Sequence, residues 1–348
     1  MINFKVGILG AGHISEIIAD TLNKLDSFEP YAIASRDIER ANAFGDKFNI
    51  EKRYGSYEEL VNDPEVELIY IATTNNLHAE HAKLCINAGK ACLVEKPFSY
   101  NTATANEVFK LAEEKGVFCG EAMWIRFLPL YQALMDILKR NVIGRVNCLQ
   151  CSLGYDLRKK ERMVKPELAG GALLDLGVYP LNLMKMVYGK YPELLTSSVA
   201  RLETGVDAEE LLNFNYTTGQ NANAVVSMMY KADNNARIYG TSGYIEIINI
   251  NNPEKINIYK GDGELLSDIP IPDRQITGYE YEFILARDAI ILGKTETNIM
   301  PHADTLTVLG IMDTLRSTWN LRFPMETEDS LPRFKPNGAP PMPPARNA

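Results

Sequence analysis

The stretch FKVGILGAGHIS, residues 4–15, decides the fold of this chain. Its first six residues predict a short buried strand, and the glycines that follow predict a tight turn that opens a helix. Gly10 permits the turn, Gly12 lets the backbone approach a pyrophosphate, and the serine that closes the stretch allows close helix–strand packing. His13 and Ile14 open the helix, whose free N–H groups would face the phosphates. We therefore expect a dinucleotide-binding α/β domain with these turn residues at the cofactor.

Strands and helices alternate through the first third of the chain. The predicted strands cover residues 31–35, 66–73, 91–97 and 117–122, and the predicted helices cover residues 14–24, 37–48, 78–89 and 101–115. Such alternation predicts βαβ units and a parallel sheet that is covered on both faces.

The pattern changes after Trp124. A helix at 130–139 leads to long alternating runs at 146–155, 197–203, 211–218, 223–230, 236–249 and 255–261, with helices near 173–187, 278–292 and 303–319. These runs predict an antiparallel sheet that is open on at least one face. We expect a dinucleotide-binding domain over residues 1–122, a substrate-binding and oligomerisation α+β domain over 123–323, and an extended Pro-rich tail over 324–348.

Charge and cysteine usage exclude several classes of protein. The net charge of −9 argues against a nucleic-acid partner, and no stretch approaches the roughly 20 apolar residues of a membrane span. The first residues lack the pattern of a cleavable signal, and five scattered cysteines are typical of free thiols in a reducing cytoplasm. Cys148 and Cys151 lie three apart in a predicted strand and would point to opposite faces, so we expect no metal site.

The end of the second predicted strand indicates which dinucleotide binds. NAD sites favour a carboxylate there for the ribose hydroxyls, whereas NADP sites favour a cation for the 2′-phosphate. Ser35 stands at the acidic position and Arg36 follows it, so we predict NADP. Asp37 leaves NAD open, although we interpret it as the N-cap of the next helix.

Three further segments form a set: Asn75-Asn76-Leu77-His78, Glu95-Lys96-Pro97, and GGALLDLGVY at residues 170–179. Together they resemble the glucose-fructose oxidoreductase/inositol dehydrogenase (Gfo/Idh/MocA) family. The phrases EAMWIRF (121–127) and ETGVD (203–207) resemble more narrowly the branch of dimeric dihydrodiol dehydrogenases and NADP-dependent D-xylose dehydrogenases. The resemblance runs from Lys5 to Phe323. It implies a Rossmann domain, then an α+β domain with a large, open, mostly antiparallel sheet, through which homodimers or tetramers form.

The resemblance also implies site residues. The cofactor would be lined by Thr73, Asn75, His78, Glu95 and Lys96. Many family members have histidine where this chain has Tyr179, but the dihydrodiol and xylose branch has tyrosine there. Thr74 stands where proline is frequent, which we expect to matter little.

The chemistry of hydride transfer gives Lys96 and Tyr179 roles. Oxidation of a carbinol releases a proton, which a tyrosine or lysine beside the oxygen can accept. Free tyrosine has a pKa near 10, so acting as a base at neutral pH requires about 4 kcal/mol of stabilisation of its anion, and a neighbouring ammonium has the right sign. We hypothesise that Tyr179 carries the proton and Lys96 assists. The reverse assignment stays open.

Other residues are expected to support this pair. Asp175 lies four residues before Tyr179, on the same face of a helix, and would orient the substrate or Lys96. Trp124 would form a wall of the substrate pocket or pack between domains. The basic run from Arg158 to Lys165 is typical of a solvated loop. We expect catalysis in a cleft between the two domains.

The predicted function is an NADP-dependent oxidoreductase acting on a sugar, polyol or cyclic diol. One alternative is a regulator that binds nucleotide without catalysis, although such a protein has no use for a proton-transfer pair. Another is an oxidoreductase that retains its cofactor and shuttles hydride between two substrates. The sequence does not identify the substrate.

Overall fold

The computed structural model describes residues 3–327, which divide into two compact units. The first unit comprises the chain up to Tyr100, then Thr104–Phe127 and Arg274–Thr305. The second comprises Asn101–Ala103, Leu128–Asp273 and the chain from Leu306 onward. The segment 274–305 therefore returns to the first unit from far along the chain. The domain boundaries inferred from sequence stay a prediction, and most of the expected tail lies outside the described residues.

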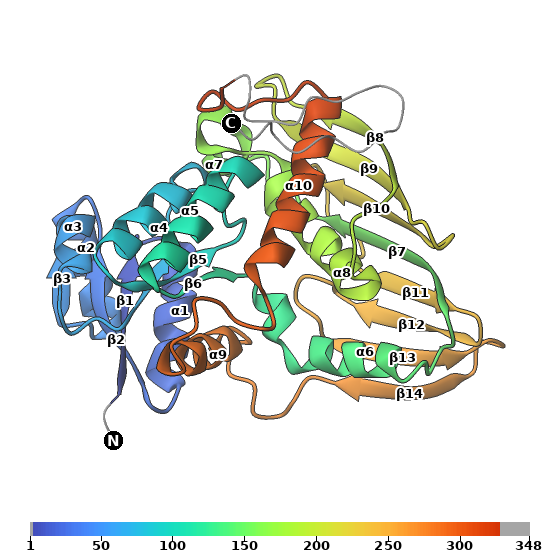
Figure 1. Ribbon diagram of the computed structural model, residues 1–348, viewed down its shortest axis with the longest axis horizontal. Coiled ribbons are helices and arrows are strands. Elements are labelled where there is room, and N and C mark those ends of the chain that lie inside the picture. The colour runs from blue at the N-terminus through green and yellow to red at the C-terminus, as the bar shows by residue number, and fades with distance from the viewer. Residues whose placement is uncertain (1–2, 328–348) are drawn as a thin grey trace. The chain divides into compact units, whose positions relative to one another are not determined.

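The first unit contains a six-stranded parallel sheet in the order β3-β2-β1-β4-β5-β6 (Figure 1). Its strands are β1 (Phe4–Leu9), β2 (Phe28–Ala34), β3 (Lys52–Tyr54), β4 (Leu68–Ile71), β5 (Ala91–Glu95) and β6 (Cys119–Ala122). Its helices are α1 (His13–Lys24), α2 (Ile38–Phe48), α3 (Tyr57–Val61), α4 (His78–Asn87), α5 (Thr102–Lys115), of which the first turn belongs to the other unit, and α9 (Glu280–Ile291). This order is that of the Rossmann fold, with its switch point between β1 and β4. The predicted fold class is confirmed.

The sequence did not predict β3 and α3. β3 has only three residues and exposes part of its surface, so it lacks a hydrophobic run. The helix after it is held by a capping box, in which Ser56 accepts from the Glu59 N–H and the Glu59 carboxylate accepts from the Ser56 N–H. The start of α3 is thus defined by local hydrogen bonds, which hydrophobic periodicity does not reveal.

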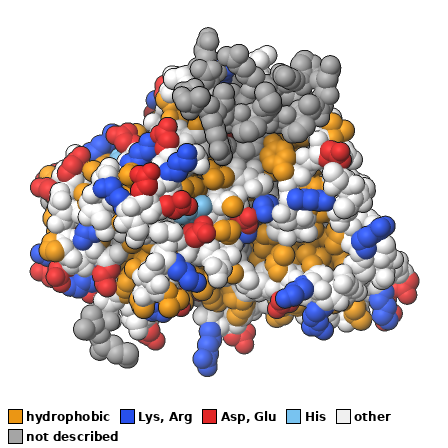
Figure 2. Space-filling model, in the orientation of Figure 1, with side chains coloured by type: hydrophobic (Ala, Val, Ile, Leu, Met, Phe, Trp, Pro, Cys, Tyr) orange, Lys and Arg blue, Asp and Glu red, His pale blue; other side chains and the backbone are white. Residues whose placement is uncertain are grey.

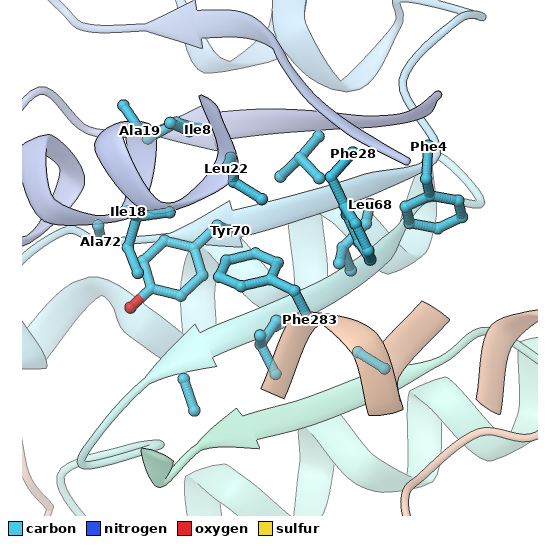
Figure 3. Packing of buried hydrophobic residues seen from close by; sticks show 14 of the residues in the cluster. Phe4, Ile8, Ile18, Ala19, Leu22, Phe28, Leu68, Tyr70, Ala72 and Phe283 are labelled. Carbon is cyan, nitrogen blue, oxygen red and sulfur yellow. The ribbon is translucent and has the colours of Figure 1, made fainter. Parts of the chain in front are cut away.

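An apolar core joins α9 to the parallel sheet. Phe283 of α9 is fully buried, and its ring lies 5.4 Å from that of Tyr70 and 6.5 Å from that of Phe28 (Figure 3). Ile18 and Leu22 of α1 belong to the same cluster. The returning segment is thus an integral layer of the first unit.

The second unit contains an eight-stranded sheet in the order β14-β13-β12-β11-β7-β10-β9-β8. Its strands are β7 (Val146–Gly154), β8 (Leu194–Arg201), β9 (Asp207–Asn215), β10 (Asn221–Ser227), β11 (Ala236–Gly240), β12 (Gly243–Ile248), β13 (Lys255–Lys260) and β14 (Leu265–Pro270). All neighbours pair antiparallel except β7 and β10. This confirms the predicted large, mostly antiparallel sheet.

Helices cover one face of this sheet. They are α6 (Pro129–Lys139), α8 (Val178–Tyr188) and the part of α10 (His302–Thr318) that follows Thr305 (Figure 1). On the covered face the Trp319 Nε1–H donates to Ser197 Oγ at 2.9 Å. The residues of the opposite face include Leu194 and Leu211, whose side chains are 45% and 47% exposed.

The cysteines behave as the sequence predicted. All five are free thiols, and Cys151 of β7 is buried whereas Cys148 is half-buried on the other face. Acidic and basic side chains are interspersed over the helices of the first unit (Figure 2). Among residues 3–327, none of the helices combines the length and apolarity that a bilayer crossing requires.

Candidate active site

The register of the parallel sheet aligns the predicted cofactor residues along one edge. Leu9 of β1 pairs with Ile71 of β4, which pairs with Val94 of β5. The residues that follow these three are therefore the glycine-rich turn, the segment 72–75 and the pair Glu95-Lys96. Carboxyl ends of parallel strands at the switch point are where ligands bind in this class of fold.

The glycine-rich turn is shaped for close approach of a ligand. Gly10 has a φ of 108°, and a Cβ there would lie 3.0 Å from the Ala72 carbonyl oxygen. Ser15, fully buried, donates from Oγ to the Gly10 carbonyl at 2.5 Å. Gly12 is the N-cap of α1 and supplies no side-chain cap, and a Cβ there would meet nothing closer than 4.0 Å. The first N–H groups of α1 are thus left for an anion, as a dinucleotide pyrophosphate requires.

Two cationic side chains follow β2, one in the loop after the strand and one in the first turns of α2. Ser35 is buried and Arg36 is exposed. Asp37 is the N-cap of α2 and accepts from the Glu39 N–H at 3.0 Å, so its role as a helix cap is confirmed. Arg40, which the sequence analysis missed, donates to the Ala11 carbonyl oxygen of the glycine turn at 3.0 Å. Its position four residues after Arg36 was the signal that could have revealed it.

His78 joins the loops that follow β4 and β5. Its Nδ1 lies 2.8 Å from the Pro97 carbonyl oxygen and its Nε2 lies 3.1 Å from the Thr73 carbonyl oxygen. Burial lowers the pKa of His78 to about 4, so the ring is neutral at physiological pH. Thr73 also contacts His81, with Oγ1 3.0 Å from Nδ1. The neutral ring carries a single N–H, so His78 donates to one of these two carbonyl oxygens while its other nitrogen lies against the second.

A buried network of polar side chains holds Glu95. The Tyr70 hydroxyl donates to Glu95 Oε1, and the other carboxylate oxygen accepts from the Lys96 N–H at 3.0 Å. Glu282 of α9 is fully buried, and burial together with the charges of Glu95 and Glu280 raises its pKa well above the usual range. Burial and these neighbouring charges thus favour the neutral form of Glu282. No local motif indicates this residue, because Glu282 lies almost 190 positions after Glu95.

Glu121, within β6, and Trp124, just after it, complete this end of the sheet in the first unit. Glu121 is buried and accepts from the Phe98 N–H at 3.1 Å and from Thr305 Oγ1 at 2.7 Å. Trp124 stacks on Tyr279 with ring centroids 4.5 Å apart, and its indole N–H is buried without a hydrogen-bond partner. Its packing partner within the first unit is therefore the returning segment.

In the second unit, Asp175 and Tyr179 lie on successive helical turns. Leu173–Gly177 forms a π-helical turn that runs directly into α8, and both side chains are largely buried. Turns of this kind are frequent at functional sites. Arg162 donates to both Asp175 oxygens, at 2.7 and 3.3 Å. Part of the basic run is therefore not a solvated loop, because it neutralises a predicted site residue.

The two glycines before this turn are tightly enclosed. A Cβ on Gly170 would lie 2.7 Å from the carbonyl oxygens of Arg162 and Met163, and one on Gly171 would overlap the carboxylate of Asp207. Gly171 also has a φ of 123°. Glycine is required here because the Arg162 loop and β9 both approach the start of the helical turn.

Comparison with known proteins agrees with this geometry. Residues 4–123 match the family model described as "Oxidoreductase family, NAD-binding Rossmann fold", and residues 131–246 match the "GFO/IDH/MocA C-terminal domain". Among similar proteins are the trans-1,2-dihydrobenzene-1,2-diol dehydrogenases of Mus musculus and Xenopus tropicalis, with 34% and 36% identity. Each alignment covers 92% of this chain and 98% or 99% of the relative.

Solved structures show the same fold at lower identity. A 3-ketoreductase from Actinomadura kijaniata, in complex with NADP and TDP-benzene, has a TM-score of 0.80 and 24% identity over 90% of this chain and 97% of its own. An aldose-aldose oxidoreductase from Caulobacter crescentus, complexed with glycerol, has a TM-score of 0.81 and 20% identity over 89% and 96%. Two models of the Gfo/Idh/MocA family match this chain, one in the dinucleotide-binding part and one in the part with the large sheet. The chain therefore belongs to the Gfo/Idh/MocA family of oxidoreductases.

Proposed function

We propose that the protein is an NADP-dependent oxidoreductase that transfers hydride between nicotinamide and a carbinol or carbonyl carbon. The substrate class is a sugar, a polyol or a trans-dihydrodiol. The alignment of the glycine turn, Thr73 and Glu95-Lys96 along one sheet edge carries this proposal. The relatives named for a trans-dihydrodiol support that substrate, since they match along nearly their whole length.

Preference for NADP rests on the cations at the end of β2. Arg36 is exposed, Arg40 contacts the glycine turn, and the carboxylate of Asp37, the next residue in the chain, is engaged as a helix cap. A 2′-phosphate would be bound by this pair of arginines, whereas Asp37 is already engaged and would not accept from a free ribose hydroxyl. Arg36→Asp is expected to lower the ratio of kcat/KM for NADP to that for NAD by on the order of 100-fold, about 2.7 kcal/mol. An unchanged ratio would show that Arg36 does not select the cofactor. The control is Lys47→Ala, which removes a cation from the last turn of α2, away from the loop that holds Arg36.

The protein's own residues supply the proton transfer. The bound dinucleotide would accept or donate the hydride. We propose that Tyr179 exchanges the proton with the substrate oxygen, while the Lys96 ammonium stabilises the tyrosinate and orients that oxygen. Asp175 acts as a positioning group, because its carboxylate is already paired with Arg162. The reverse assignment, with Lys96 as the proton carrier, is separated from this one by experiment.

The test follows nicotinamide absorbance with NADP over a panel of trans-1,2-dihydrobenzene-1,2-diol, D-xylose and simple polyols. We expect turnover of at least one member, and a loss of kcat of on the order of 10²–10⁴-fold in Tyr179→Phe and in Lys96→Met. If only Tyr179→Phe removes the pH dependence of kcat, tyrosine carries the proton. Full activity in both variants would refute the scheme, and silence across the panel with tight NADP binding would indicate a sensor.

We also propose that the protein self-associates through the uncovered face of its eight-stranded sheet. Leu194 and Leu211 expose their side chains on that face, and Tyr239, Tyr244 and Tyr259 form a row across three strands, with centroid distances of 5.8 and 4.6 Å. Exposed leucines and a row of half-buried tyrosines on one uncovered sheet face are typical of an interface.

A cytoplasmic location is the remaining part of the proposal. Five unpaired thiols, four of them buried, suit a reducing compartment. Titration with a thiol reagent after unfolding, on protein purified without reductant, should find all five. Fewer than five would argue for disulfides and for another compartment.

A further inference from the structure

The segment Glu203–Asp207 ends in Asp207, whose side chain contacts the backbone just before the Asp175–Tyr179 segment. Gly205, with a φ of 92°, turns the chain between β8 and β9, and Asp207 is the first residue after that turn in β9. Asp207 is 1% exposed, and its Oδ2 accepts from the Leu173 N–H at 2.6 Å. That N–H belongs to the first residue of the π-helical turn.

Residues of both chain segments that meet here hold the Asp207 carboxylate in contact with the backbone of residues 171–173. Gly171 could not carry a side chain without displacing the Asp207 carboxylate, so the backbone and the carboxylate lie in direct contact. Glu210, on the same strand and fully buried, faces Asp207, and burial followed by the charge of Asp207 raises the pKa of Glu210 well above its usual range. Burial and the neighbouring Asp207 carboxylate thus both favour the neutral form of Glu210.

We infer that Asp207 is a positioning residue, which anchors the first turn of the Leu173–Tyr188 helix and thereby fixes Asp175 and Tyr179 for proton transfer. The inference rests on the proposed function. The carboxylate binds an N–H at a helix start, where it also interacts favourably with the helix dipole. From there the π-helical turn leads rigidly to Asp175, two residues on, and to Tyr179, six residues on. A displacement of about 1 Å at this start would misplace both side chains, which is enough to cost on the order of 100-fold in rate.

The test is a double-mutant cycle on kcat, with trans-1,2-dihydrobenzene-1,2-diol or the panel member that is turned over as substrate. Asp207→Ala removes the acceptor and is expected to lower kcat by 10- to 100-fold. Asp207→Asn keeps an acceptor oxygen and should remain within about threefold of the parent protein. Glu209→Gln is the matched control, because it replaces a carboxylate of the same strand that accepts from Ser227 Oγ and not from the Leu173 N–H, and kcat should change less than about twofold.

The cycle separates positioning from general damage to the fold. If Asp207 acts through Tyr179, then Asp207→Ala in a Tyr179→Phe background should change kcat by less than about threefold. The Kd for NADPH, measured by fluorescence, should stay within about twofold in every Asp207 variant, because the proposed cofactor residues belong to the other unit. Should Asp207→Ala not fold, Asp207→Ser, which keeps a polar side chain too short to reach the Leu173 N–H in the same way, enters the same cycle.

The outcomes are distinct. An unchanged kcat in Asp207→Ala, or an equal fold-loss in both backgrounds, overturns the inference while leaving the proposed function intact. Full activity of Tyr179→Phe alone, or no turnover of any panel member, refutes the proposed function first and the inference with it.

Discussion

Gly10 and Gly12 occupy the same turn but are glycine for different reasons. Gly10 has a positive φ and lies against the Ala72 carbonyl, so Gly10→Ala should lower the free energy of unfolding by about 1–3 kcal/mol. Gly12 has a φ of −102° and no atom within contact of its missing side chain. Gly12→Ala should therefore cost only the loss of a favourable N-cap, about 1 kcal/mol or less, and weaken NADPH binding at least about 10-fold. Chemical denaturation and fluorescence titration measure the two effects. Unweakened binding in Gly12→Ala would mean that the dinucleotide does not approach this residue.

Single residues were predictable where their chemistry is local. The glycine turn, the Asp37 cap and the candidate lysine and tyrosine each belong to a short motif, so sequence was enough to propose them. Arg162 and Asp207 were not recognised as partners of the Asp175 segment. Their contacts join positions 13 and 34 residues apart, and no spacing rule covers a contact that only the packed sheet and loop create.

At the scale of elements, His78 couples two loops and makes stability depend on pH. Its pKa is about 4 in the folded protein against 6.5 in the unfolded chain, so the unfolded state binds more protons between these values. The contribution of the neutral ring is therefore complete above pH 6.5 and is lost as the pH falls toward 4. Between pH 7 and pH 5 the free energy of unfolding of the parent protein should fall by about 2 kcal/mol more than that of His78→Gln, whose side chain does not titrate. Urea unfolding at both pH values measures this. A constant difference would mean that the folded protein holds His78 as a cation.

The sequence does not indicate that α9 packs against the parallel sheet of the first unit. Its helical pattern was predicted near residues 278–292, but nothing local shows that Phe283 packs against Tyr70 and Phe28 of a sheet built more than 200 residues earlier. Phe283→Ala should lower the free energy of unfolding by about 3–5 kcal/mol, because a fully buried ring leaves a cavity. Ile291→Ala, at a side chain 70% exposed on the same helix, should cost less than about 0.5 kcal/mol. Equal losses would show that α9 does not contribute this core.

At the scale of the whole molecule, the sequence predicted both sheets, because the hydrophobic residues of each strand follow a recognisable pattern. Strands alternate with helices in the first part of the chain, and apolar residues alternate with polar ones in the second. These patterns did not predict that one pair, β7 and β10, is parallel. Pairing order depends on how the chain crosses over between strands, and the helical turn with Asp175 and Tyr179 lies on one such crossover. The sequence therefore named these candidate residues without indicating which strands surround them.

The uncovered sheet face leads to the prediction about assembly. Leu211 of β9 lies in register with Ser198 of β8 and Val225 of β10, so it stands at the centre of a three-strand outward patch. If copies of the chain pair through this face, Leu211→Glu places two like charges near a desolvated interface and should raise the dimer dissociation constant at least about 100-fold. Ile291→Glu adds the same charge at an exposed apolar residue of the other unit and should leave association unchanged. Sedimentation over a range of protein concentrations distinguishes the variants, and NADPH affinity should remain equal in both because neither residue lies at the strand ends proposed to bind the cofactor. A parent protein that sediments as a monomer at all concentrations, or a Leu211→Glu variant that still pairs, would assign another role to this face.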